Sequence, residues 1–279
     1  MQKFYNKIFS IFSQNSFFIK EFFYYSFNKK KLKTLLEKKN PLVSIILPTY
    51  NRSEMLKTRS IRSILKQSYT NFELLVISDG STDDTEEIVN SFNDVRIKLI
   101  KISRNKKRYP QTAINHWFAG PVFAINKGLS IVKGDWIARI DDDEIWGKNH
   151  LKFTLDGLYQ GKCEFCSSKR FELRKGIFTK EIGADLLQVN NYGLKIGGVN
   201  TWVYAGYLKF MKSNINCWRK ENNKVNDTDV CNRMMRLGVK THYLEKCTHI
   251  SFPREKDGLV GSKYYLMNEK EILNKYNIK

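Results

Sequence analysis

The chain has 279 residues, of which 42% are hydrophobic and 27% charged, a composition typical of a globular protein with room for one large α/β domain or two packed units. Its formal net charge of +20 favours an anionic partner, such as nucleic acid, an anionic membrane leaflet or a phosphorylated substrate. The sequence has no run near the ~20 uncharged apolar residues of a membrane-spanning helix, and no signal-peptide pattern at its start. We therefore expect a cytoplasmic protein.

Residues 1–40 differ from the rest of the chain in being strongly basic, with nine lysines and two glutamates. Large apolar side chains recur in this segment at roughly helical spacing, at Phe4, Ile8, Phe12, Phe18, Phe22 and Phe23. A basic, aromatic amphipathic helix can lie in a membrane interface with its lysines on anionic head groups. The pattern fits equally a helix packed on the following domain or a frayed leader, because residues 13–16 interrupt the stripe.

Apolar runs alternate with helical patterns from residue 41 onward. A buried strand is predicted from the run 42–47, and a second and a third strand from the runs 72–77 and 96–102. This alternation predicts an α/β fold with a mostly parallel central sheet flanked by helices. Because ligands bind beyond the carboxyl ends of the strands in such sheets, the loops at 48–52, 78–81 and 141–143 should converge.

Helices are expected between these strands and after them. Ser53 should cap the first helix, whose inner face consists of Leu56, Ile61, Ile64 and Leu65. The turn at 78–84 should lead into the second helix, which runs through Val89. Later helices are predicted over 120–129, 151–159, 229–237 and 263–275, and later strands over 164–178 and 240–244.

Three consecutive aspartates, Asp141, Asp142 and Asp143, follow a further apolar strand pattern. Adjacent carboxylates repel one another, so their position at the end of a buried strand indicates a bound cation. Mg²⁺ and Mn²⁺ prefer oxygen ligands and are usually held by one or two carboxylates, with substrate phosphates completing the shell. The sequence therefore predicts a site for Mg²⁺ or Mn²⁺ here.

Four motifs follow one another in order: Val43-Ser-Ile-Ile-Leu-Pro-Thr-Tyr-Asn-Arg52, Ser63-Ile-Leu-Lys-Gln-Ser-Tyr69, Asp79-Gly-Ser-Thr-Asp83 and Asp141-Asp-Asp143. Together they resemble the non-processive family 2 glycosyltransferases of the GT-A fold that build bacterial surface polysaccharides. The resemblance is strong over residues 41–150 and looser over 195–250. It implies a Rossmann-like nucleotide-binding half over 41–150 and an acceptor-binding half over 151–255, between the basic segment 1–40 and a basic helix within 256–279.

The resemblance also implies which residues hold the donor. Positions matching those that bind the nucleotide base and ribose are Pro48, Thr49, Tyr50, Arg52 and Asp79. Asn126, in a segment that departs from the family's Ala-Arg-Asn-Thr, is expected among the donor contacts. The sequence departs from the family pattern also at Ser78, where a second aspartate is common, and at Asn226, where glutamate is common.

Asp141 and Asp143 match the aspartates that bind the metal and, through it, the donor diphosphate. His249 is a further candidate ligand. Asp142 is expected at the donor site, either as a metal ligand itself or as a residue that supports the ligands from behind. Asp227 matches the catalytic base, which would take a proton from the acceptor hydroxyl in a single displacement with inversion at C1. Asp229 lies close enough in sequence to be a rival for this role.

Each assignment has a purely structural alternative. The loop residues Pro48 and Tyr50 would then only shape a turn, and Asp79 would cap the following helix. Asp227 would likewise be a helix cap. A lone histidine such as His249 is more often hydrogen-bonded than metal-bound.

The predicted function is metal-dependent transfer of a single sugar from a nucleotide-diphosphate sugar, with UDP the expected carrier. The acceptor would be a glycan or lipid-linked glycan of surface polysaccharide or lipopolysaccharide, with a peripheral contact to the anionic inner membrane. The missing Gln-x-x-Arg-Trp motif argues against processive synthesis. The alternatives are a sugar nucleotidyltransferase and a basic nucleic-acid-binding protein, although the chain has no nucleic-acid-binding signature and no nucleic acid is expected as a partner.

Overall fold

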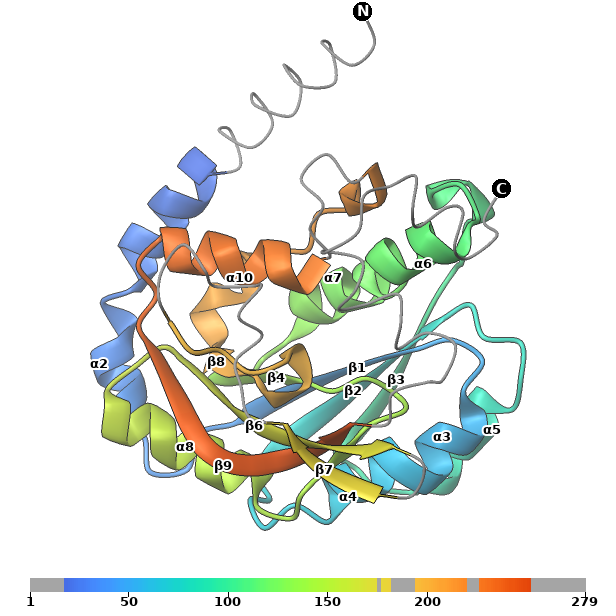
Figure 1. Ribbon diagram of the computed structural model, residues 1–279, viewed down its shortest axis with the longest axis horizontal. Coiled ribbons are helices and arrows are strands. Elements are labelled where there is room, and N and C mark those ends of the chain that lie inside the picture. Colours follow the sequence, from blue (N-terminus) through green and yellow to red (C-terminus); the bar gives the residue numbers. More distant parts are fainter. Residues whose placement is uncertain (1–17, 175–176, 182–193, 220–225, 252–279) are drawn as a thin grey trace, which may run out of the picture.

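A computed structural model describes residues 18–174, 177–181, 194–219 and 226–251, and the helix expected over 263–275 lies outside them (Figure 1). The strands are β1 (Val43–Thr49), β2 (Phe72–Asp79), β3 (Ile97–Ile102), β4 (Trp136–Arg139), β5 (Ile145–Trp146), β6 (Phe165–Arg174), β7 (Ile177–Glu181), β8 (Val203–Ala205) and β9 (Thr241–Ser251). The α-helices are residues 18–28, α2 (Lys31–Leu36), α3 (Ser53–Met55), α4 (Ile61–Leu65), α5 (Thr85–Ser91), α6 (Ala113–Ala119), α7 (Val122–Ile131), α8 (His150–Gly161) and α10 (Asn226–Arg236). A π-helical turn, Leu56–Ser60, joins α3 to α4, and short 3-10 turns cover Lys106–Arg108, Val199–Thr201, Gly206–Phe210 and Cys217–Arg219.

The described strands form one nine-stranded sheet in the order β3-β2-β1-β4-β8-β6-β9-β5, with β7 paired to β6. The first four strands in this order are parallel, as predicted for the nucleotide-binding half of an α/β fold. Beyond β4 the sheet is mixed, because β8 is antiparallel to both of its neighbours and β6 runs parallel to β9. Figure 1 shows α7 and α10 on one side of the sheet and α4 and α8 on the other.

The helical segment after β1 packs as predicted but begins differently. Leu56, Ile61 and Ile64 are fully buried against the sheet, which confirms the expected inner face. The prediction that Ser53 caps the helix was wrong, because Ser53 is already helical and its side chain makes no cap. Its backbone N–H donates instead to Asp83 Oδ2 at 3.0 Å. A carboxylate from the loop after β2 therefore supplies the helix with its acceptor.

The loops after β1, β2 and β4 converge at one edge of the sheet, as expected. Asn51 adopts a left-handed backbone with φ of 51°, and its side-chain Oδ1 accepts from the Thr82 N–H at 2.8 Å. Thr49 Oγ1 donates to Asp142 Oδ2 at 2.8 Å. The parallel register behind these contacts places Thr49 beside Ser78 and Ile46 beside Arg139.

The strand predicted over 240–244 extends to Ser251 as β9. Leu244 pairs with Ser168 while Cys247 pairs with Lys169, so Glu245 and Lys246 form a bulge in the ladder. Both side chains at the bulge are exposed. Because their charges interrupt the apolar pattern, the sequence indicated an end of the strand where the structure has only an irregularity.

The helix of residues 18–28 packs one face on the domain. Tyr25 is buried, and its hydroxyl donates to Glu164 Oε2 at 2.9 Å. Glu21 is buried as well and forms an ion pair with Arg233 of α10. Of the helices within the described residues, none is both long and apolar enough to cross a membrane.

Candidate active site

The acidic cluster lies where β4 ends. Asp142 is buried, with 9% of its surface exposed, and accepts the hydrogen bond from Thr49 that ties the cluster to β1. Burial, followed by the neighbouring charge of Asp143, raises the pKa of Asp142 to about 7. Arg52, just before α3, acts in the opposite direction and favours the ionised carboxylate. A cation bound beside the cluster would act in the same direction as Arg52.

Asp141 is held by two residues that the sequence motifs did not identify. Arg139 Nη2 donates to Asp141 Oδ1 at 3.0 Å, and Asn200 Nδ2 donates to Asp141 Oδ2 at 3.2 Å. The Asp141 backbone N–H in turn donates to Asn200 Oδ1 at 2.8 Å. A charged arginine inside the apolar strand pattern was the signal available for Arg139, whereas Asn200 comes from a distant segment and carried none.

Asp141 and Asp143 could each offer carboxylate oxygens to a hard divalent cation, although both oxygens of Asp141 also accept the hydrogen bonds from Arg139 and Asn200, and their role as metal ligands remains a prediction. Within the described part of the chain, no group of three or more histidine, cysteine, aspartate or glutamate side chains is arranged to hold a metal. One or two carboxylates with diphosphate oxygens and water is the usual arrangement for Mg²⁺. Arg59 Nη1 donates to the Asp143 carbonyl at 3.0 Å and so fixes the backbone of the loop.

His249 lies in β9 opposite Trp146 and is 2% exposed. Its Nε2 atom is 3.0 Å from Oε2 of Glu144, the residue that directly follows the acidic cluster in the sequence. Ser251 Oγ donates to the other oxygen of Glu144 at 3.1 Å. His249 thus lies close to a carboxylate beside the cluster, although neither of its ring nitrogens makes a hydrogen bond to a residue that the structure describes, and its role as a metal ligand remains a prediction.

Asp79 lies at the end of β2, where two arginines bind its carboxylate. Arg104 Nη1 donates to Asp79 Oδ2 at 2.9 Å, and Arg108 Nη1 donates to Asp79 Oδ1 at 2.7 Å. The Arg104 guanidinium also stacks on the Tyr50 ring, 3.9 Å from its centroid. The alternative in which Asp79 caps the next helix was wrong, because Asp83 accepts from the Thr85 N–H at 3.2 Å.

Tyr50 and Pro48 differ in their exposure. Tyr50 is 38% exposed at the start of the loop, directly after β1, whereas Pro48 is buried within β1 opposite Ile77. The sequence motifs did not identify Arg104 and Arg108. Their available signal was the basic run of residues 104–108, which directly follows the third predicted strand.

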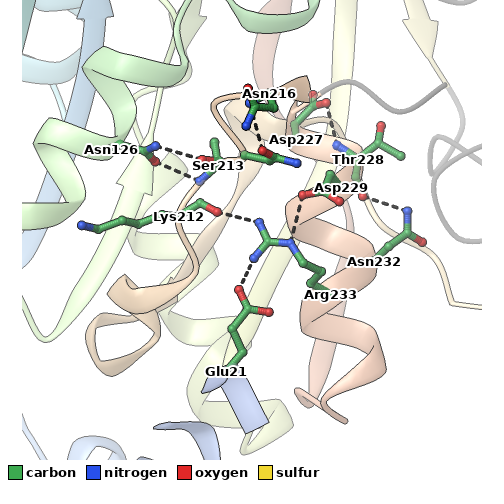
Figure 2. Close-up of polar contacts among 11 residues, drawn as sticks. Glu21, Asn126, Lys212, Ser213, Asn216, Asp227, Thr228, Asp229, Asn232 and Arg233 are labelled. Carbon is green, nitrogen blue, oxygen red and sulfur yellow. Dashed lines mark hydrogen bonds and ion pairs between the residues drawn. The ribbon is translucent and has the colours of Figure 1, made fainter. Parts of the chain in front are cut away.

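Asn126 connects α7 to the loop that precedes α10 (Figure 2). Its Nδ2 atom donates to the Ser213 carbonyl at 2.9 Å, and the Ser213 N–H donates to Asn126 Oδ1 at 2.8 Å. Both polar atoms of the amide are thus engaged with one backbone segment. The donor contact expected of Asn126 remains a prediction. In the structure, its side-chain amide holds this loop.

Asp227 and Asp229 both lie in the first turn of α10 but have different surroundings (Figure 2). Asp229 Oδ2 accepts from Arg233 Nε at 2.9 Å, and Arg233 also donates to the Lys212 carbonyl at 2.6 Å. Asp227 Oδ1 accepts from the Thr228 N–H at 2.7 Å, at the end of the helix where a negative charge is favoured. Asp229 therefore forms an ion pair with Arg233.

Arg139 lies between the acidic cluster and α10. Its Nη2 atom binds Asp141, and its Nη1 atom lies 3.5 Å from Oδ1 of Asn226, the residue before Asp227. Asn226 is buried and donates from Nδ2 to the Phe118 carbonyl at 3.2 Å. One side chain thus spans the two motifs, which are more than 80 residues apart in the chain.

Solved structures with a similar fold are glycosyltransferases. S. aureus TarS, in a crystal structure with UDP-GlcNAc, superposes with a TM-score of 0.59 at 17% identity, covering 79% of this chain and 61% of that chain. The mannosyltransferase PcManGT from Pyrobaculum calidifontis, in complex with GDP-Man and Mn²⁺, gives a TM-score of 0.51 at 13% identity, covering 91% of this chain and 75% of that one. At these identities the similarity shows the GT-A fold alone.

Sequence relatives are named as glycosyltransferases too. An uncharacterized glycosyltransferase of Haemophilus influenzae is 29% identical over 85% of this chain and 96% of its own length. The Escherichia coli enzyme WfgD, named as a UDP-Glc:alpha-D-GlcNAc-diphosphoundecaprenol beta-1,3-glucosyltransferase, is 37% identical over 44% of each chain. The family model described as "Glycosyl transferase family 2" matches residues 44–240. The chain therefore belongs to glycosyl transferase family 2 and is a glycosyltransferase.

Proposed function

We propose that the protein is a metal-dependent, inverting glycosyltransferase that adds one sugar from a nucleotide-diphosphate sugar to a glycan or lipid-linked glycan of the cell surface. The observation that carries this proposal is the position of Arg139, which contacts both Asp141 and Asn226. The acceptor oxygen that loses its proton attacks the same C1 from which the diphosphate leaves, so the two motifs have to share one site. The family match favours this reaction over nucleotidyl transfer and nucleic-acid binding.

The donor diphosphate would bind at the acidic cluster. Asp141 and Asp143 would hold Mn²⁺ or Mg²⁺, which when bound neutralises the charge that develops on the departing diphosphate. Asp142, joined to Thr49, would fix the shape of this loop, and Arg52 would offset its charge. His249 would support the cluster through Glu144 or complete the metal shell.

The nucleoside would lie at the loop after β1, against Tyr50 and Asp79. Tyr50 presents a half-exposed ring, and Arg104 already stacks on it. A base entering here would contact this ring and the groups that bind Asp79. UDP is the proposed carrier, supported by the UDP-GlcNAc complex of TarS and the UDP-Glc donor in the name of WfgD.

Asp227 would act as the catalytic base. It would accept the proton of the acceptor hydroxyl while the oxygen of that hydroxyl forms a bond to C1 of the sugar. The bond from C1 to the diphosphate oxygen breaks, and its electron pair leaves with the diphosphate. Attack opposite the leaving group inverts the configuration at C1. The match of Asp227 to the position of the base in the family motif supports it over its neighbour Asp229 for this role.

The acceptor is proposed to be a glycan carried on a membrane lipid, with the enzyme peripheral at the inner face of the cytoplasmic membrane. The name of WfgD specifies a diphosphoundecaprenol-linked acceptor. The match to WfgD covers 44% of each chain, so membership of the family does not by itself assign this acceptor class to the protein.

The decisive experiment is a set of three variants assayed with a panel of nucleotide sugars. Asp227→Asn should abolish transfer and retain metal-dependent thermal stabilisation by the nucleotide diphosphate. Asp143→Asn should lose that stabilisation. Asp156→Asn, an exposed aspartate on α8, is the matched control and should behave as wild type. Full transfer activity in Asp227→Asn would overturn the assignment of the base.

A further inference from the structure

Exposed hydrophobic side chains are concentrated in one helix. Among the residues that the structure describes, nine large hydrophobic side chains are exposed, and five of these lie within residues 19–27. Their exposed fractions are Ile19 57%, Phe22 49%, Phe23 57%, Tyr24 48% and Phe27 70%. Single exposed apolar residues are ordinary on a protein surface, but a contiguous group indicates a binding surface.

The helix of residues 18–28 has two faces with different roles. Glu21 and Tyr25 face the domain and are both nearly fully buried. The opposite side carries Ile19, Phe22, Phe23 and Phe27, which we call the aromatic face. Their spacing of three, four and eight residues places them on one stripe of the helix. A surface helix that served only to pack on the domain would have polar side chains there.

Lysines flank the aromatic face in the sequence. Lys20 lies on the helix itself, and Lys29, Lys30, Lys31 and Lys33 follow it directly. All of them are exposed. Aromatic side chains flanked by lysines can insert into the apolar layer of a bilayer while the lysines attract its anionic head groups. Both interactions favour binding to an anionic bilayer in the same orientation.

We propose that the aromatic face is a docking surface for an anionic lipid bilayer. Phe22, Phe23 and Phe27 enter the boundary between head groups and acyl chains, and the adjacent lysines contact lipid phosphates. The positive charge of the surrounding segment selects a lipid surface over a second copy of this chain, because two copies would bring like charges together. The inference rests on the proposed function only for the idea that the acceptor is carried on a membrane lipid.

The docking helix is joined to the helix that bears the candidate base. Glu21 forms an ion pair with Arg233, which also binds Asp229 in the first turn of α10 (Figure 2). Arg236 lies over the Phe18 ring, 3.8 Å from its centroid. Figure 1 shows the helix beside the end of α10. A bilayer bound to the aromatic face would therefore hold α10 and Asp227 in a fixed relation to its surface.

The test is co-sedimentation of the full chain with phosphatidylcholine–phosphatidylglycerol vesicles, in the absence of nucleotide. The triple variant Phe22→Ser, Phe23→Ser and Phe27→Ser should bind at least about tenfold more weakly than wild type, because three partly inserted rings are lost. Val95→Ser removes another exposed apolar side chain, 97% exposed, and should bind as wild type. Binding should weaken in pure phosphatidylcholine and at high salt. Thermal stability and nucleotide binding of the triple variant should equal those of wild type, which confirms its fold.

Three results would overturn the proposal. These are a wild-type protein that fails to sediment with the anionic vesicles, a triple variant that binds them as tightly as wild type, and a triple variant that loses a dimer seen by light scattering while neither protein binds vesicles. Vesicle binding and sugar transfer are separate measurements. If Asp227→Asn keeps full transfer while the vesicle result holds, the assigned base is wrong and the docking surface stands.

Discussion

Replacing Arg139 by methionine should separate the two motifs that this side chain spans. Methionine fills a similar volume but removes the charge and the donors to Asp141. The Arg139 side chain is 10% exposed and that of Asp141 32%. Breaking a fully buried pair costs roughly 3–5 kcal/mol and breaking an exposed one less than about 1 kcal/mol, so an intermediate loss of about 2 kcal/mol is expected. In thermal unfolding this is a decrease of roughly 4–8 °C in Tm.

The effect of Arg139→Met on activity should exceed its effect on folding. Partners that orient a metal ligand typically contribute about 10–100-fold to metal affinity or activity. We expect a decrease of that size in Mn²⁺-dependent release of nucleotide diphosphate, measured below the variant's unfolding temperature over a series of Mn²⁺ concentrations. Arg62→Met, at an exposed position on α4, is the matched control. A folded Arg139→Met protein with the metal dependence and turnover of wild type would refute the bridging role.

Three further predictions concern the structure around the site. Burial and the neighbouring His249 hold the pKa of His150 well below 6.5, so its neutral form favours folding above pH 6.5 and this stability is lost as the pH falls. In urea unfolding, wild type should lose about 2 kcal/mol of its unfolding free energy at pH 5. The His150→Phe variant should not show this loss, and its Thr248 hydroxyl stays satisfied because it keeps its hydrogen bond with Ser168. Gly134→Ala should destabilise by about 1–3 kcal/mol in the same assay, because the new Cβ would lie 2.4 Å from the Ser44 nitrogen, whereas Gly147→Ala should cost less. Arg233→Met and Glu21→Gln should show a coupling of roughly 1–2 kcal/mol in a double-mutant cycle, and additive effects would contradict a direct ion pair.

Hydrophobic patterning was sufficient to predict the parallel part of the sheet. The apolar runs that became β1 and β2 are buried along their whole length, because helices cover both faces of a parallel sheet. The convergence of their loops then follows from topology alone, since parallel strands end at the same edge. The contact between Thr49 and Asp142 is the direct result.

The unpredicted parts depend on partners far apart in the chain. Asp83, rather than Ser53, serves the start of α3 because the left-handed turn at Asn51 brings the two loops together. The arginines on Asp79 and the amide of Asn200 on Asp141 likewise pair across 25 or more residues. Local periodicity carries no information about such pairs. A polar residue in an apolar run, such as Arg139, is the clearest local sign that one exists.

The structure also shows where some of the basic residues behind the net charge of +20 lie, which composition could not show. Arg104, Arg108 and Arg139 are mostly buried beside carboxylates of the candidate donor site, with side chains 16%, 11% and 10% exposed. The lysines between residues 20 and 33 are exposed and flank the aromatic face in the sequence. Planar guanidinium groups suit fixed, partly desolvated pairing with carboxylate or phosphate, whereas the hydrated lysine ammonium suits a mobile head-group layer. The two kinds of basic residue therefore fit the two anionic partners proposed above, a nucleotide diphosphate and a lipid surface.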